Sequence, residues 1–244
     1  KKAKWASAKD VILYILQQLS VKGGVNKIIE YTGEGLKELS LTDRATICNM
    51  GAELGATTSV FPTDEITKEY LIQQGREEDY VELKADDDAT YDEEITVDLS
   101  KLVPLTAKPH SPDAVVPVSE LRGMKINQVV IGSCTNSSLP DMLKAAKILK
   151  GRRVATHVSL VIAPGSSSIL AMLSKCGALA DMIASGARIL ECGCGPCIGM
   201  GQAPLSKGVS LRTINRNFKG RSGTNDASVY LVSPEVAALS AIKG

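Results

Sequence analysis

Apolar and polar residues alternate at helical spacing in the first part of the chain. Over residues 5–24, Val11, Ile15 and Leu19 share one face of a helix that Ser7 caps and a Gly-Gly pair ends. The same reasoning predicts further helices over 42–54 and 64–74, and short strands over 25–32, 56–61 and 95–99. Residues 76–93 are acidic and hydrophilic, which indicates a solvated loop. Residues 1–100 are therefore expected to form a smaller α/β domain.

The pattern of apolar and polar residues changes near the middle of the chain. Pro104, Pro109, Pro112 and Pro117 lie close together, which predicts an extended, proline-rich connector over residues 101–123. Beyond it, apolar runs typical of buried strands alternate with helical patterns. We expect strands at 127–131, 159–163, 188–190, 211–214 and 229–232, and helices at 139–149, 166–175, 178–185 and 235–244. This order predicts a larger domain over residues 124–244, with α/β/α layers and mixed, mostly parallel sheets.

Composition and charge narrow the class of function. The formal net charge is +1, so no strong overall field draws the chain to nucleic acid or to a membrane surface. No apolar run approaches the roughly 20 residues of a membrane span, and the basic start of the chain is not followed by the core of a signal peptide. Six cysteines without a secretory signal favour metal or cluster binding in a reducing compartment over disulfides. We therefore expect a cytoplasmic protein that binds neither membrane nor nucleic acid.

Three of the cysteines occupy positions that suit a site. Cys134 follows the predicted strand 127–131, and Cys194 and Cys197 follow the strand at 188–190. The carboxyl ends of neighbouring parallel strands meet at one edge of an open sheet, where α/β proteins build their sites. A C-x-x-C pair alone is compatible with structural zinc, a redox dithiol or an iron–sulfur cluster. Cys192 is a nearby spare thiol.

Four stretches resemble the aconitase and isopropylmalate dehydratase family, in the same order along the chain. They are IGSCTNS at 131–137, CGPCIG at 194–199, ATICNMGAE at 45–53 and NRNFKGR at 215–221. The resemblance covers essentially the whole chain and implies the fold of the aconitase iron–sulfur domains.

Motif by motif, the resemblance assigns roles to residues. It implies a 4Fe-4S cluster with one iron that has no protein ligand, held by Cys134, Cys194 and Cys197. It further implies a catalytic role for Glu53, a hydrogen bond from Asn215 to the cluster, and substrate binding by Asn49, Arg216 and Arg221.

The resemblance also sets expectations for activity. It implies a hydro-lyase that interconverts citrate and isocitrate through cis-aconitate, and the Gly-Pro within CGPCIG favours this tricarboxylate chemistry. The alternatives are an isopropylmalate or homoaconitate hydro-lyase of the same family, or a regulator that binds RNA when the cluster is lost. The family's first domain, with its His and Asp residues, and its C-terminal mobile domain, with a serine base, have no counterpart here. We therefore expect a fragment that is inactive alone and that needs those domains for activity. The expected location is the cytoplasm or, in a eukaryote, the mitochondrial matrix.

Overall fold

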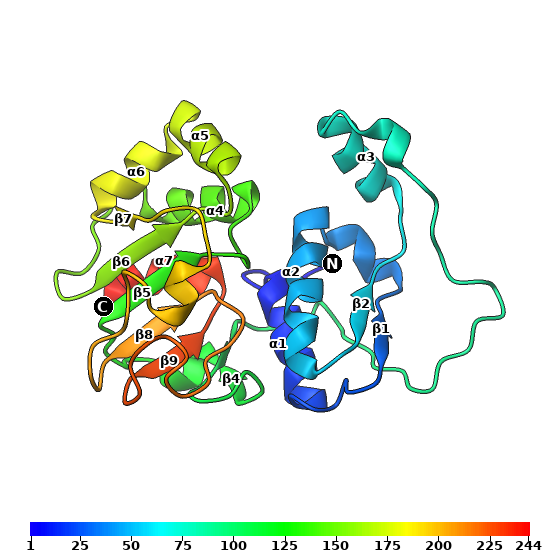
Figure 1. The fold of residues 1–244 in the computed structure, drawn as a ribbon, viewed down its shortest axis with the longest axis horizontal. Helices are drawn as coiled ribbons and strands as arrows, with labels where there is room; N and C mark the ends of the chain where they lie inside the picture. The colour runs from blue at the N-terminus through cyan, green and yellow to red at the C-terminus, as the bar shows by residue number, and fades with distance from the viewer.

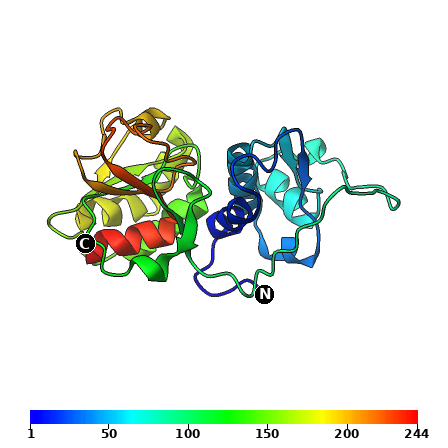
Figure 2. The same ribbon diagram turned by 90° about the horizontal axis from the view of Figure 1, so that it is seen from below.

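The chain forms two lobes that lie side by side. The computed structural model describes every residue from Lys1 to Gly244, and both ribbon views separate a first lobe from a second (Figures 1 and 2). The helices and strands of the first lobe are α1 (Ala8–Leu19), β1 (Ile28–Glu30), α2 (Leu41–Gly51), β2 (Thr58–Val60) and α3 (Glu65–Gln73). Short 3-10 helices lie at Glu34–Glu38, Ala52–Leu54 and Glu77–Asp79. Strands β1 and β2 pair in parallel as a sheet of two.

The second lobe is built on a sheet of seven strands. They are β3 (Leu105–Ala107), β4 (Val115–Pro117), β5 (Gln128–Gly132), β6 (Ser159–Ala163), β7 (Arg188–Ile189), β8 (Val209–Arg212) and β9 (Ser228–Leu231). Their spatial order is β4-β3-β9-β8-β5-β6-β7. The five strands from β9 to β7 run parallel, whereas β3 and β4 pair in the antiparallel sense. The predicted mixed, mostly parallel α/β class is thus confirmed.

Helices and 3-10 turns connect these strands. The helices are α4 (Leu139–Leu149), α5 (Ser167–Lys175), α6 (Ala178–Ser185) and α7 (Pro234–Lys243), with 3-10 helices at Val118–Leu121 and Gly195–Ile198. Helix α7 packs against β5 and α4, and α4 against α5 and α6. No single helix is long and apolar enough to cross a membrane, and α5 with α6 meets that criterion only as a pair bent by 89°.

Two hydrophobic cores hold the molecule together. One lies between the parallel strands and their helices, around Val129, Ile131 and Ile162. The other combines α1 and α2 of the first lobe with residues of the second, among them Leu105 and Leu231. Because this second core includes residues of both lobes, burial of apolar surface joins them directly.

The middle of the chain differs from its predicted form. Residues 101–123 were expected to be an extended connector, but they contain the hairpin β3–β4 at the edge of the large sheet. Proline is tolerated on an edge strand, where no further ladder hydrogen bond is lost, and Pro117 lies at the end of such a strand. The strand predicted at 95–99 is wrong. Val97 and Leu99 do pack against the second core, but no strand lies beside them to pair.

Candidate functional site

The sheet order creates a crevice between β5 and β8. From β5 the chain moves outward to β6 and β7, then returns to β8 and β9 on the other side of β5. Ligands of open α/β sheets bind at such a reversal, beyond the carboxyl ends of the strands. Cys134 lies just after β5 and Asn215 just after β8, and the segment with Cys194 and Cys197 follows β7.

A cavity of about 360 Å³ lies at this edge. All the predicted site residues except Asn49 and Glu53 line it, and those two are hydrogen-bonded to residues that do. The lining residues are Cys134, Cys194, Gly195, Cys197, Ile198, Met200, Ile214, Asn215, Arg216 and Arg221. The structure therefore brings together motifs that are far apart in the sequence.

The loop after β5 has a backbone that fixes Cys134. Gly132 has φ 109°, and a Cβ there would lie 1.9 Å from the carbonyl oxygen of Ala163, so only glycine fits. Ser133, with φ 92°, donates its N–H to the same oxygen at 2.9 Å. The Ser133 hydroxyl lies 2.9 Å from the sulfur of Cys197 and so links the two cysteine loops.

The pKa values of Cys134 and Cys197 depend on one another. Interaction with Cys197 lowers the pKa of Cys134 to about 5, against the opposing effect of burial. The same interaction, together with burial, raises the pKa of Cys197. The pair therefore favours the thiolate form at Cys134, and thiolates are the form in which cysteine binds metal.

A buried arginine that the sequence reasoning missed holds the second cysteine loop. Arg212, at the end of β8, is fully buried. Its Nη1 donates to the carbonyl of Pro196 at 2.5 Å, and its Nη2 donates to the carbonyl of Gln202 at 2.5 Å and to Oε1 of Gln128 at 2.8 Å. Nε donates to the hydroxyl of Ser210 at 3.0 Å. Since Pro196 lies between Cys194 and Cys197, this guanidinium fixes the C-x-x-C loop to the sheet.

Residues of the first lobe reach the segment after β8. Arg216 donates from Nε and Nη2 to Oε1 of Glu53, at 2.9 and 2.6 Å. Burial raises the pKa of Glu53, and the hydrogen bond from Arg216 opposes that rise. Asn215 donates to Oδ1 of Asn49 at 2.5 Å and accepts from the hydroxyl of Thr135. Glu53 thus orients Arg216 rather than lining the cavity itself.

Arg221 lines the cavity and is not fully paired within the protein. Its Nε is buried and has no hydrogen-bond partner. A buried donor without a partner is costly, and the guanidinium group as a whole is suited to paired hydrogen bonds with a carboxylate. The cation therefore suits an anionic ligand beside the cysteines.

The remaining cysteines lie elsewhere. All six are free thiols. Cys48 is half-buried against the carbonyl of Ser59, Cys176 is exposed near Leu173, and Cys192 is exposed outside the cavity lining. The structure therefore presents three cysteines at the cavity, not four.

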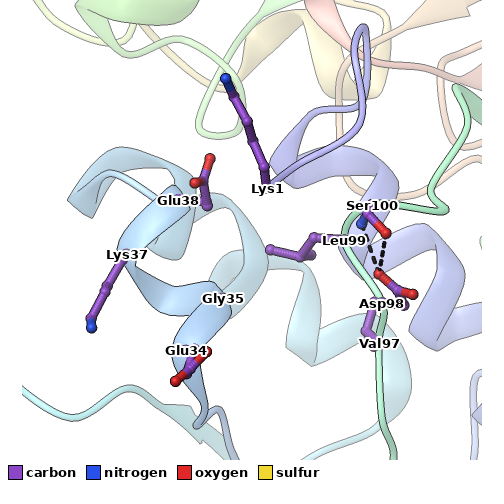
Figure 3. A pocket seen from close by; sticks show the side chains of 9 residues that line it. All are labelled: Lys1, Glu34, Gly35, Lys37, Glu38, Val97, Asp98, Leu99 and Ser100. Atoms are coloured by element: carbon purple, nitrogen blue, oxygen red, sulfur yellow. Dashed lines mark hydrogen bonds between the residues drawn. The ribbon is translucent and has the colours of Figure 1, made fainter.

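A second pocket, of about 460 Å³, lies in the first lobe (Figure 3). Charges of both signs surround it, including Lys37, Glu38 and Asp98, and Asp98 already accepts hydrogen bonds from Ser100. None of the predicted site residues lines it. It gives no reason to move the candidate site away from the cysteines.

The three cavity cysteines lie on two strand-exit loops that face a shared cavity. No group of three or more His, Cys, Asp or Glu side chains is arranged to hold one metal ion. Cysteine thiolates are the ligands of iron–sulfur clusters, so the donor atoms at the cavity have the chemistry that such a cluster requires.

Comparison with known proteins identifies what the chain is similar to. A family model described as the aconitase family (aconitate hydratase) matches residues 1–124 and 119–244. The 3-isopropylmalate dehydratase large subunit 2 of Archaeoglobus fulgidus is 44% identical over 99% of this chain, and the 3-isopropylmalate dehydratase large subunit of Clostridium kluyveri is 45% identical over 100% of this chain. The methanogen homoaconitase large subunit of Methanocaldococcus jannaschii is 42% identical over 98%. The chain spans 58%, 58% and 59% of the lengths of these three relatives.

Proposed function

Because the chain belongs to the aconitase family, we propose that it carries the iron–sulfur site of a hydro-lyase that dehydrates 3-isopropylmalate. The chain spans little more than half of its relatives, so the activity is that of a longer or multi-subunit protein. Two of the relatives are named as large subunits of 3-isopropylmalate dehydratase, which supports a partner subunit or domain that completes the site.

Cys134, Cys194 and Cys197 would hold a 4Fe-4S cluster at the cavity. Three thiolates leave one of four irons without a protein ligand, and Cys192 lies outside the lining, so it does not complete the set. When bound, the cluster would supply a Lewis acid beside the substrate hydroxyl. The low pKa of Cys134 and the Arg212 clamp on the C-x-x-C loop preorganise these ligands.

Arg216 and Arg221 would grip the substrate carboxylates. The observation that carries the proposal is that Arg216 and Arg221 line the same cavity as the three cysteines, and that the buried Nε of Arg221 has no partner within the protein. Planar guanidinium groups bind carboxylates through paired hydrogen bonds. Glu53 accepts hydrogen bonds from Nε and Nη2 of Arg216 and so fixes the orientation of the guanidinium group. Asn215 is hydrogen-bonded to both Asn49 and Thr135.

The comparisons favour the 3-isopropylmalate reading over the citrate reading that the CGPCIG motif suggested. The relatives quoted above are named for 3-isopropylmalate or homoaconitase chemistry, and none for citrate. Homoaconitase is the second candidate, supported by the 42% identity to the methanococcal large subunit. All these substrates are hydroxy acids with at least two carboxylates, so the two arginines serve each of them.

A substrate panel tests the proposal. The full-length protein, with its partner subunit where that is a separate chain, is reconstituted anaerobically with iron and sulfide. It is then assayed with 3-isopropylmalate, homocitrate and citrate by the ultraviolet absorbance of the unsaturated product. We expect the highest kcat/KM with 3-isopropylmalate. A preference for citrate or homocitrate would refute the assigned substrate, and a loaded cluster with no dehydration of any of the three would refute the hydro-lyase.

A further inference from the structure

The short segment after β8 is tied to the first lobe by three sets of contacts. We call residues 213–216 the β8 exit segment. Asn215 is bonded to Asn49, and Arg216 to Glu53. The third set comes from Lys9 near the start of α1, whose Nζ donates to the carbonyl oxygens of Thr213 at 2.7 Å and Ile214 at 2.8 Å. Lys9 therefore binds the backbone that immediately precedes the two site side chains.

The surroundings of Lys9 are unusual for a lysine. Its side chain is fully buried, and it takes part in none of the ion pairs of the structure. Both of its hydrogen bonds go to main-chain carbonyls of the other lobe. Burying an ammonium without a contacting carboxylate is costly, and an apolar residue of similar length would fill the space at lower cost. Packing alone does not account for a lysine here.

Burial and nearby charges act on Lys9 in opposite directions. Burial lowers the pKa of Lys9 from 10.5 to about 7, and the charges of Asp141, Cys134, Asp10 and Glu53 oppose that shift. Two of these groups, Cys134 and Glu53, belong to the candidate site.

We infer that Lys9 is a positioning residue for substrate binding, which clamps the β8 exit segment so that Asn215 and Arg216 are held at the cavity. The inference rests on the proposed function for the identity of the ligand, but the clamp itself does not. Without the ammonium, the carbonyls of Thr213 and Ile214 lose their donor. The polar contacts that remain between the exit segment and the first lobe are those of Asn215 and Arg216, the side chains that must contact the substrate. The free energy of substrate binding must then also offset the entropy that is lost when that segment becomes ordered.

The test compares Lys9→Met with Lys9→Gln and with the control Lys101→Met, in the full-length reconstituted protein. Methionine keeps the length of the side chain and removes the donors, whereas glutamine keeps an amide donor. Lys101 has a side chain that is 83% exposed and makes only a 3.5 Å ion pair with Asp98. Four quantities are measured: hydrogen exchange of the amides in residues 213–216, iron and sulfide content, Tm, and the steady-state constants for the best substrate of the panel.

In Lys9→Met we expect faster exchange in residues 213–216 and a rise in KM of about tenfold or more, with iron content retained. Lys9→Gln should lie between Lys9→Met and the wild type, and Lys101→Met should match the wild type. Unchanged exchange and KM in Lys9→Met would overturn the inference, as would a rise in KM that only follows a loss of Tm and iron. If Lys9→Met does not fold, the same criteria apply to Lys9→Gln. An inactive wild type would refute the proposed function, and the exchange data would still decide whether Lys9 is a clamp.

Discussion

Removing the guanidinium of Arg212 should loosen the loop that carries Cys194 and Cys197. Arg212 is fully buried and donates to the carbonyls of Pro196 and Gln202, one on each side of Cys197. In Arg212→Met the apolar stem is kept and the donors are lost. The two carbonyl oxygens are then left in the interior without that partner.

The expected cost follows from those two acceptors. A buried polar group that loses its partner costs about 1–3 kcal/mol, so two of them cost about 2–6 kcal/mol. Part of this is offset because the variant no longer buries a cation, whose pKa is lowered to about 10 by that burial. We expect a net loss of about 2–4 kcal/mol in the free energy of unfolding. At roughly 2–4 °C per kcal/mol for a domain of this size, Tm should fall by about 4–16 °C.

The assay is thermal unfolding of the cluster-free full-length protein, followed by iron and sulfide analysis after anaerobic reconstitution. Arg212→Met should melt earlier and retain less iron, because its C-x-x-C loop is no longer fixed to the sheet. Arg212→Lys is the matched control. It keeps the charge and part of the hydrogen bonding but loses the fork, so it should fall between Arg212→Met and the wild type. A Tm within about 1 °C of the wild type and full iron content in Arg212→Met would refute the reasoning.

Three further predictions concern other parts of the molecule. Cys134→Ser should fail to bind iron and sulfide on reconstitution while Cys192→Ser binds them normally, and equal loading of the two variants would remove Cys134 from the ligand set. Arg221→Lys keeps the charge but not the planar fork, so kcat/KM of the full-length enzyme should fall about tenfold or more, whereas the exposed Arg152→Lys should not change it. Asp10 is buried, which raises its pKa from 3.8 to about 6. The folded state therefore binds that proton more tightly, and the stabilisation is full below about pH 4 and is lost as pH rises through about 6. Urea unfolding of cluster-free protein should show the advantage of wild type over Asp10→Asn shrinking by about 3 kcal/mol over that range, and a constant difference would contradict the assignment.

Local sequence patterns predicted the second lobe well. Residues 129–131 and 160–163 are apolar throughout, as strands buried on both faces must be, and the structure has β5 and β6 there. Once the strands are known to be parallel, their carboxyl ends share an edge, so Cys134, Cys194 and Cys197 had to lie near one another. The cavity that all three line agrees with that reasoning.

Other features depend on long-range contacts that no local pattern encodes. The hairpin β3–β4 exists because β9 and α1 offer it a partner strand and a packing surface, while its prolines read locally as a connector. Residues 95–99 alternate like a strand but have no neighbour to pair with. Nothing local in the sequence marks Lys9 or Arg212 as buried, because burial of a charge is decided by acceptors far along the chain, such as the carbonyl of Thr213 for Lys9.

The two lobes divide the work of the site. The three cavity cysteines lie in the second lobe, and Arg212 fixes their C-x-x-C loop from within that same lobe. The carboxylate contact proposed for Arg216, in contrast, depends on the first lobe, since Lys9, Asn49 and Glu53 all contact the β8 exit segment across the boundary. Changes within the second lobe should therefore act first on iron retention, and changes on the first-lobe side should act first on substrate binding. The second hydrophobic core joins the lobes at this segment through Ile214, and Cys197 packs against the same core. A movement of one lobe against the other would therefore alter both the proposed carboxylate contacts and the C-x-x-C loop.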